Sequence, residues 1–416
     1  MKPATLIIAG AGGRGAAYAN YVAAHPDRGK VVGVAEPIDL RRNRIVERHD
    51  VPAANVFTDW VDLAARPKFA DAVMICTQDA MHAEPALAFA EKGYHILLEK
   101  PLAPTEKECT RIIDAVKKAG VLFAVCHVLR YTRYTRMLKQ VVDSGELGDV
   151  VCMDHLEPVG YWHQAHAFTR GHWRNTAESS FMLLAKSCHD LDWMHYVLGK
   201  HCTSLASFGA LSHFCDKGKP EGAAERCLDC KIEQTCPYSA LKIYLRDRFD
   251  KGVTGWPVRN LTDDEITLDS LTRALRTGPY GRCVYACDND VVDHQVVAMN
   301  FDDGATASFT MTGFTRMRGR QTRIHGTRGE LRGDSSNIEI YDYLTDTTRT
   351  IDTNASTGDI TGGHGGGDEG LMHGFLEALN TGDASKILTG PDDTLESHRM
   401  VFAAEKSRLE NRVVSL

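Results

Sequence analysis

Apolar runs of strand length alternate with amphipathic segments of helix length over the first third of the chain. The strands predicted from these runs cover residues 6–9, 30–36, 72–77, 95–99 and 121–126, and the helices between them cover residues 14–24, 40–49, 59–65, 83–92 and 105–118. Pro26, Gly93 and Gly120 stand where three of these helices should end. This alternation predicts a parallel, doubly wound α/β sheet with a ligand at the carboxyl ends of its strands.

The pattern changes after Tyr131. One more helix, to about residue 144, leads into a stretch rich in aromatic residues and histidine, and strand-like alternation recurs at residues 291–301, 305–314, 322–325 and 338–343. These strands predict a C-terminal α+β domain with a large, mostly antiparallel open sheet. Because 416 residues exceed one ordinary core, we expect two domains, residues 1–128 and 129–416. The final helix is free to pack back on the first domain.

Residues 358–370 are too rich in glycine for a helix or strand, so we expect a loop there. It is either slack chain or a loop that packs closely on a ligand. His364 and Asp368 within it favour the ligand loop.

The first strand runs into a glycine turn that is typical of dinucleotide binding. Gly10 permits a sharp exit from the strand, Gly12 lets the backbone approach a pyrophosphate, and Gly15 lets the next helix lie close to the sheet. With Gly13 and Arg14, these residues open a helix whose N-terminal N–H groups attract an anion. The turn predicts a Rossmann domain at the N-terminus.

Glu36 ends the second strand, where a carboxylate accepts hydrogen bonds from both hydroxyls of an adenosine ribose and repels a 2′-phosphate. The sequence therefore favours NAD over NADP as cofactor. Arg41 and Arg42 lie close by in sequence and would soften this preference.

Composition and charge exclude several classes of partner. A formal net charge of −7 without a basic cluster gives no surface for nucleic acid. The first five residues lead directly into the first strand, and no apolar run reaches membrane-spanning length. We expect a cytoplasmic protein with no membrane partner, whose 12 cysteines are mostly reduced thiols.

One group of cysteines leaves an alternative open. Cys227, Cys230 and Cys236, with Cys215 or His213 upstream, would supply four ligands for a structural zinc ion. A single CxxC pair with a looser third cysteine is a weaker signal than two well-spaced pairs. Reduced thiols on a surface insertion are therefore the favoured reading, with zinc as the alternative.

With a nucleotide domain that ends in Glu99-Lys100-Pro101 and an antiparallel domain after it, the chain resembles the Gfo/Idh/MocA oxidoreductases, named for glucose-fructose oxidoreductase and inositol dehydrogenase. The further marks of this resemblance are the glycine turn with Glu36, the turn from Thr77 to His82, Arg130 after the last strand of the first domain, and residues 186–192. The resemblance covers nearly the whole chain.

The resemblance implies roles for particular residues. In this family the lysine of Glu-Lys-Pro lies beside the nicotinamide and the substrate, and a histidine on a helix of the second domain is the usual proton acceptor. The matching residues are Lys100 and His189. Glu99, Thr77 and His82 would line the cofactor on its nicotinamide side.

The chain departs from the family at one position. Many members carry an aspartate four residues before the histidine, where this chain has Ala185 followed by Lys186. A cation beside His189 would lower the pKa of the imidazole and keep it basic at neutral pH. Lys186 would otherwise hold a substrate oxygen.

Oxidation of a secondary alcohol needs a hydride acceptor and a base within reach of the hydroxyl. NAD supplies the first and His189 the second, while a cationic Lys100 stabilises the developing alkoxide. The structural alternative for His189 is a helix residue bonded to Asp190 or Asp192. His294, which interrupts an apolar strand, is the reserve candidate for the base.

A polyhydroxylated substrate suits flat apolar rings beside multiple hydrogen-bond donors. The residues expected at such a substrate are Arg130, Tyr161, Trp162, Arg170, Trp173, Lys186, His294 and His364.

We therefore expect an NAD-dependent oxidoreductase that acts on a secondary hydroxyl of a sugar, cyclitol or glycoside. One alternative is a redox-neutral, NAD-dependent glycosidase that oxidises, eliminates and reduces again. A second is a non-catalytic, nucleotide-sensing regulator. Because a large open sheet needs a cover, we also expect a homo-oligomer, a dimer or tetramer, formed through the C-terminal sheet.

Overall fold

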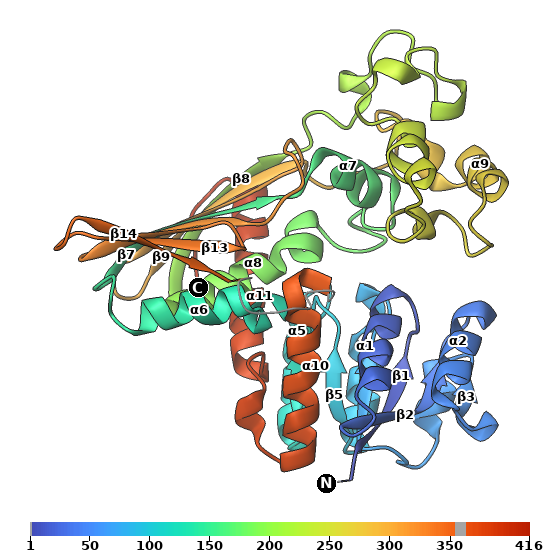
Figure 1. Ribbon diagram of the computed structural model, residues 1–416, viewed down its shortest axis with the longest axis horizontal. Helices are drawn as coiled ribbons and strands as arrows, with labels where there is room; N and C mark the ends of the chain where they lie inside the picture. The colour runs from blue at the N-terminus through green and yellow to red at the C-terminus, as the bar shows by residue number, and fades with distance from the viewer. Residues whose placement is uncertain (1, 354–362) are drawn as a thin grey trace.

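The computed structural model describes residues 2–353 and 363–416, with side chains from residue 365 onward in the second range. Its first domain contains a six-stranded parallel sheet with the strand order β3-β2-β1-β4-β5-β6 (Figure 1). The strands are β1 (Ala4–Ala9), β2 (Gly29–Ala35), β3 (Val56–Phe57), β4 (Ala72–Ile75), β5 (His95–Leu98) and β6 (Phe123–Val125). The helices that follow them are α1 (Gly13–Ala24), α2 (Asp39–His49), α3 (Trp60–Ala65), α4 (Ala83–Glu91) and α5 (Glu106–Ala119).

Helices cover both faces of this sheet, because alternate residues of each strand point to opposite sides. Leu6 and Ile8 of β1 join the apolar core beneath α1 and α2, whereas Ile7 joins the core beneath α4 and α5. Local signals fix the helix ends: Thr105 caps the start of α5, and Gly120 ends it in the left-handed conformation. The predicted doubly wound sheet is confirmed.

The second domain contains a nine-stranded sheet in the order β14-β13-β12-β11-β7-β10-β9-β8-β15. Its strands are β7 (Val150–Pro158), β8 (Cys202–Ala210), β9 (His294–Phe301), β10 (Thr306–Thr312), β11 (Gln321–Gly326), β12 (Gly329–Gly333), β13 (Asn337–Asp342), β14 (Thr347–Asp352) and β15 (Val414–Ser415). Strands β7 and β10 pair in parallel and the other neighbours pair antiparallel, which confirms the predicted mostly antiparallel sheet.

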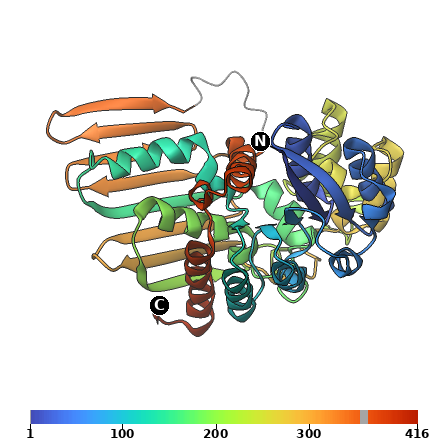
Figure 2. The ribbon, with the colours of Figure 1, turned by 90° about the horizontal axis from the view of Figure 1, so that it is seen from below.

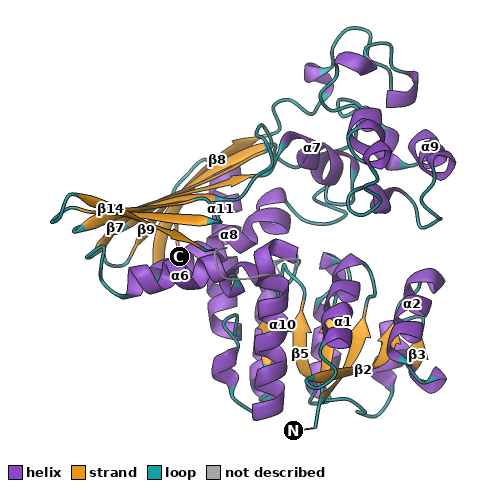
Figure 3. Ribbon diagram, viewed as in Figure 1, coloured by secondary structure: helices purple, strands orange, loops and turns teal. Residues whose placement is uncertain are grey.

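Helices α6 (Arg133–Asp143), α8 (Met182–Leu198) and α11 (Pro391–Glu410) lie on one face of this sheet (Figure 3). Figure 2, in which α11 is the dark red helix, shows it between the two domains, where it packs on α8 and α5. The opposite face of the sheet carries Val151, Phe208 and Val296, which are exposed.

The segment from residue 363 onward is helical, so the predicted loop is wrong over that part. Helix α10 spans Gly363–Thr381, and residues 354–362 lie outside the described residues. A Cβ on Gly367 would lie 2.4 Å from the Val128 carbonyl oxygen, and one on Gly370 would lie 2.7 Å from that of Tyr131. These glycines therefore let α10 pack closely on the chain after β6, against their low helix propensity.

Residues 211–293 form an insertion between the neighbouring strands β8 and β9, at the upper right of Figure 1. It consists of short helical segments, with α9 (Leu268–Thr277) the longest of those described, around an apolar core of its own. Helix α7 (Tyr161–His163) and the π-helical turn η4 (Gln164–Arg170) pack against it. Within residues 2–353 and 363–416, no helix is long and apolar enough to cross a membrane.

Candidate active site

The glycine turn between β1 and α1 stands at the carboxyl edge of the first sheet. Gly10 has a φ of +94°, and a Cβ there would lie 2.6 Å from the carbonyl oxygen of Cys76, just after β4. A Cβ on Gly15 would lie 2.1 Å from the Gly10 carbonyl oxygen. Gly12 and Gly13 face open space instead, with no neighbouring heavy atom within 4 Å of the Cβ position. A cofactor pyrophosphate fits this opening at the N-terminus of α1.

Glu36 closes the glycine turn from the side of β2. Its carboxylate is buried and accepts hydrogen bonds from the backbone N–H groups of Ala11, at 2.7 Å, and Ile38, at 3.0 Å. These bonds fix a negative charge beside the turn. That charge favours the hydroxyls of a ribose over a 2′-phosphate.

The two arginines near Glu36 are engaged with acids. Arg42 pairs with Asp39 and donates to the Glu36 carbonyl oxygen at 2.6 Å. Arg41 pairs at 3.1 Å with Asp263 of the insertion. Both guanidinium groups therefore have acidic partners, and their effect on the choice between NAD and NADP stays a prediction.

Arg14, Glu99 and Asp368 form an ion-pair network beneath the turn. Arg14 Nε lies 2.7 Å from Glu99 Oε1, Arg14 Nη2 lies 2.6 Å from Asp368 Oδ1, and the Tyr18 hydroxyl donates to Glu99 at 2.6 Å. Burial raises the pKa of Glu99, but the charges of Arg14 and Lys100 outweigh it and hold this pKa below its ordinary value. The network joins α1, the end of β5 and α10. Contacts of Arg14 and Glu99 with the cofactor stay predictions.

His82 links the turn after β4 to the segment after β5. It is fully buried, with Nδ1 2.7 Å from the Pro101 carbonyl oxygen and Nε2 3.2 Å from that of Thr77. The Thr77 hydroxyl donates to the Met81 carbonyl at 3.2 Å. His82 therefore positions the backbone on both sides of the nicotinamide end rather than facing a ligand itself.

Lys100 and His189 come together from the two domains. Lys100 follows β5, and its Nζ donates to the carbonyl oxygen of Ala185 on α8 at 2.6 Å. His189 lies four residues further along α8, hence on the same face of the helix. Its ring is nearly buried and lies edge-on to His127, with 5.5 Å between ring centroids. Lys100 Nζ also lies 5.7 Å from the centre of the Trp173 ring.

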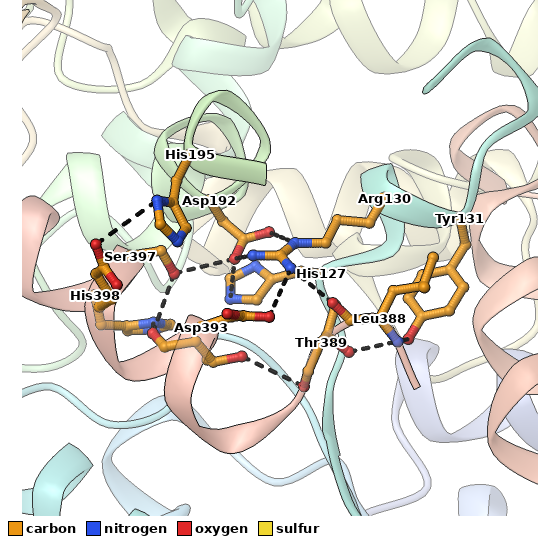
Figure 4. A network of polar contacts seen from close by, with 12 residues as sticks. His127, Arg130, Tyr131, Asp192, His195, Leu388, Thr389, Asp393, Ser397 and His398 are labelled. Carbon is orange, nitrogen blue, oxygen red and sulfur yellow. Dashed lines mark hydrogen bonds and ion pairs between the residues drawn. The ribbon is translucent and has the colours of Figure 1, made fainter. Parts of the chain in front are cut away.

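Asp192 belongs to a buried network at the domain junction (Figure 4). Arg130 Nε and Nη2 donate to its two oxygens at 2.8 and 2.7 Å, and the Ser397 hydroxyl donates at 3.0 Å. The third nitrogen of Arg130 donates to the Leu388 carbonyl at 2.6 Å. Arg130 is only 1% exposed. The structure therefore gives Arg130 a place inside the junction, not the expected place at the substrate.

Asp190 is held in a second network between α8 and β7. It accepts hydrogen bonds from Arg320 and from His155 Nε2, the latter at 3.2 Å. Glu157 pairs with Arg320 at 2.9 Å and with Lys186 at 3.3 Å. The charge of Lys186 is thus partly balanced by Glu157. Asp190 and Asp192, the two acids proposed as structural partners of His189, are each paired with an arginine: Asp190 with Arg320, and Asp192 with Arg130.

The chain after η4 brings Trp173 and His172 to Lys100. The two rings lie 3.8 Å apart between centroids. Burial lowers the pKa of His172, with Asp79 opposing and Lys100 adding to the effect. His163 is held well below its usual pKa by burial and by the charge of Lys186. Among the predicted substrate residues, Trp173 is the one whose ring meets Lys100.

Three other predicted substrate residues face the insertion. The Tyr161 hydroxyl lies 3.3 Å from Lys242 Nζ, and the Arg248 guanidinium lies 3.9 Å from the centre of the Trp162 ring. Arg170 is completely enclosed by the insertion and donates to the Arg282 carbonyl oxygen at 2.7 Å. These contacts with the insertion are against the expected substrate role.

Two further candidates are His294 and His364. His294 begins β9, with Nδ1 2.8 Å from the carboxylate of Asp293, and its role as reserve base stays a prediction. The side chain of His364 lies outside the described residues. Across the described residues, no three His, Cys, Asp or Glu side chains are already arranged to hold a metal ion.

Two family models match the chain end to end. Residues 5–127 match the GFO_IDH_MocA model, described as "Oxidoreductase family, NAD-binding Rossmann fold". Residues 139–416 match the model described as "Oxidoreductase family, C-terminal alpha/beta domain". The chain belongs to the Gfo/Idh/MocA oxidoreductase family. The predicted enzyme class and NAD as cofactor are thereby confirmed, and a non-catalytic regulator is disfavoured.

Individual relatives are distant in sequence. The protein YteT of Bacillus subtilis (strain 168) is 23% identical over 356 residues, which are 80% of this chain and 78% of YteT. The 2,7-anhydro-N-acetylneuraminate hydratase of Escherichia coli (strain K12) is 24% identical over 50% of this chain and 53% of its own length. The solved structure of levoglucosan dehydrogenase in complex with NADH superimposes with a TM-score of 0.71 at 19% identity and covers 99% of both chains. This last similarity shows the shared fold.

The site of this Gfo/Idh/MocA protein includes residues that the sequence did not single out: Asp79, His127, Glu157 and Arg320. Asp79 and His127 stand just after β4 and β6. The rule that carboxyl ends of parallel strands gather at one edge would have found both. Glu157 and Arg320 come together because their segments are neighbours in the folded sheet, so no local sequence pattern predicts their contact.

Proposed function

We propose that this enzyme transfers a hydride between NAD and a secondary hydroxyl of a sugar, cyclitol or glycoside. The observation that carries the proposal is the hydrogen bond from Lys100 Nζ to the Ala185 carbonyl of α8, one helical turn before His189. NAD, when bound, supplies the hydride acceptor. Lys100 orients the substrate hydroxyl and stabilises negative charge on its oxygen, and His189 takes its proton.

The side chains around Lys100 suit a polyhydroxylated ring. Trp173 offers a flat apolar face 5.7 Å from Lys100 Nζ, on which the C–H groups of a sugar can stack. His172 and Lys186 supply polar groups on either side of it. Lys186 Nζ lies 3.3 Å from Glu157 Oε1. Because an ammonium group has three hydrogen atoms, the others are available to a substrate oxygen.

The test is a panel of sugars, inositols and simple glycosides offered to the enzyme with NAD, followed by the absorbance of the reduced nicotinamide. The proposal expects NADH in proportion to one class of substrate. Product release from the glycosides is followed in parallel. Absence of turnover in both channels with every compound, while NAD binds, would contradict the proposed substrate class.

A redox-neutral glycosidase is the second candidate. It is favoured by relatives named 2,7-anhydro-N-acetylneuraminate hydratase, from Escherichia coli at 24% identity and from Mediterraneibacter gnavus at 27% identity. Release of the aglycone without net NADH, together with uptake of solvent deuterium into the sugar, would select this candidate over the dehydrogenase.

We also propose a homo-oligomer in which a second copy covers the outer face of the nine-stranded sheet. Phe208 is 65% exposed on β8, the strand next to the edge strand β15, and pairs with Val296 on the neighbouring strand β9. Phe208→Asp should shift the mass measured by light scattering towards the monomer. A mass equal to that of the unchanged protein would argue against this interface.

A further inference from the structure

Four cysteines of the insertion line one small cavity. Cys227, Cys230, Cys236 and Cys283 surround a space of about 20 Å³. A cavity of this size holds about one water-sized body. Cys215 is not among its lining residues, so the structure changes the ligand set that the sequence suggested.

The local backbone explains why these cysteines meet. Cys227 and Cys230 stand at the two ends of a tight 3-10 turn, and the N–H of Cys230 reaches the Cys227 carbonyl at 3.4 Å. The distant segment with Cys283 is joined to them by a β-bridge between Arg226 and Arg282 and by a 2.8 Å hydrogen bond from the Cys283 N–H to the backbone before the turn. Two segments far apart in sequence thus supply cysteines to the wall of one cavity.

The Cys227 sulfur already accepts a hydrogen bond from the backbone. The N–H of Ala240 donates to it at 3.4 Å. An N–H group directed at sulfur stabilises a thiolate, the form that binds metals.

Arg170 supplies the second, independent observation. Its guanidinium is buried within the same cavity wall and donates to the Tyr238 carbonyl at 2.8 Å and to the Cys227 sulfur at 3.4 Å. Within the ranges that the structure describes, no carboxylate pairs with it, and the acidic groups nearest its charge are Tyr244 and cysteine thiols. A buried cation without an anionic partner is unfavourable. The thiols around it are the groups that can supply the anion.

We propose that Cys227, Cys230, Cys236 and Cys283 bind one structural Zn²⁺ ion. Binding releases four protons from four thiols and forms four Zn–S bonds, with no oxidation or reduction. The resulting centre carries two negative charges, which face the Arg170 guanidinium. In the structure as described the four thiols line the cavity without yet standing at ligand positions, and binding of the ion would bring them to Zn–S distances of about 2.3 Å. The cavity has room for a single ion rather than an iron–sulfur cluster.

The zinc centre would affect the active site by holding a neighbouring segment of the chain in place. Arg170 is the last residue of η4, and Trp173 follows it by three residues and lies against Lys100. By holding Arg170, the centre fixes the segment that carries the Trp173 ring. We expect it to be a closed site with no role in hydride transfer.

The test measures zinc, iron and acid-labile sulfide in the full-length protein purified from zinc-supplemented medium without chelators. The proposal expects about one zinc per chain, released in step with the reaction of four thiols when a mercurial reagent is added. X-ray absorption at the zinc edge should show four sulfur neighbours. Protein with less than about one zinc in ten chains, or iron with sulfide instead of zinc, would overturn it.

Two matched variants assign the ligands. Cys283→Ser should lose the zinc, whereas Cys215→Ser, at a partly exposed cysteine of the same insertion outside the cavity, should keep it. Retention of zinc by Cys283→Ser together with its loss from Cys215→Ser would contradict the proposed set. If Cys283→Ser does not fold, the absorption spectrum of the unchanged protein still decides between four sulfurs and a mixed ligand set. Neither result depends on enzyme activity, so failure here leaves the proposed function standing.

Discussion

The Arg130–Asp192 pair offers the sharpest test of how the two domains are held together. Both side chains are buried, and Arg130 makes two hydrogen bonds to the Asp192 carboxylate. Arg130→Met keeps most of the apolar stem but leaves that carboxylate with only Ser397 and His127 near it. Removal of one partner from a buried pair destabilises by about 3–5 kcal/mol. Because Ser397 still donates, we expect about 3 kcal/mol.

The assay is urea unfolding at pH 7.5, followed by tryptophan fluorescence, with the loss read from the first transition. Arg130→Met/Asp192→Asn removes the stranded charge as well, so the double variant should be more stable than the single one. Lys139→Met is the control, because its ion pair with Asp143, which is 57% exposed, lies at the surface. Such a pair contributes about 0–1 kcal/mol.

The pH dependence provides a second reading of the same variant. In the unchanged protein the pKa of His127 is lowered to about 4, chiefly by burial, with the charge of Asp192 opposing this effect and that of Arg130 adding to it. Burial raises the pKa of Asp192, but Arg130 holds it below its ordinary value. Without Arg130 both pKa values rise, so the folded variant binds a proton that the unchanged protein does not. The difference in free energy of unfolding between the unchanged protein and Arg130→Met should therefore become smaller as pH falls from about 7.5 to 5.5. A loss of unfolding free energy below about 1 kcal/mol at pH 7.5, or a loss that becomes larger on acidification, would refute the reasoning.

Three further predictions concern the cofactor and the chemistry. Lys100→Ala and His189→Ala should each lower turnover by about 10²–10⁴-fold with NAD affinity retained in calorimetry; a loss of affinity in both would show that the roles are misassigned. Gly12→Val should weaken NAD binding with little change in Tm, because its Cβ position faces open space, whereas Gly10→Val should lower Tm because φ is +94°; equal effects on Tm would contradict this reading. Glu36→Ala should narrow the ratio of kcat/KM for NAD over NADP, and an unchanged ratio would remove Glu36 from cofactor selection.

The first sheet could be predicted because its strands are buried on both faces. β4, with the sequence Ala72-Val-Met-Ile75, is buried at every position, so a plain apolar run marks it. The second sheet was predicted only in part. Strands β7 and β8 escaped because their inward positions include the buried polar residues His155, Glu157 and Ser207, while Phe208 points outward. Apolar periodicity cannot reveal a strand whose buried side is polar.

The same distinction separates the site residues that could be placed from the sequence from those that could not. Residues at strand ends, such as Gly10 and Lys100, are fixed by topology and could be placed from sequence. Arg130 and Arg170 could not, because an arginine in a motif looks the same whether it faces a substrate or a buried partner. The partner of Arg130 is Asp192, which stands in another motif of the same family. Its burial is a property of the domain junction, which no local window contains.

Ala185 shows how a change of one residue alters this junction. Where many relatives carry an aspartate, this chain offers Lys100 a backbone carbonyl at 2.6 Å. A carbonyl carries a partial charge, so it orients the ammonium without neutralising it as a carboxylate would. The positive charge of Lys100 is therefore less neutralised and acts more strongly on a substrate oxygen. Lys186, the neighbouring residue, turns instead to Glu157 on the second sheet. We therefore expect Lys100 to stabilise negative charge on a substrate oxygen more strongly than it would beside a carboxylate.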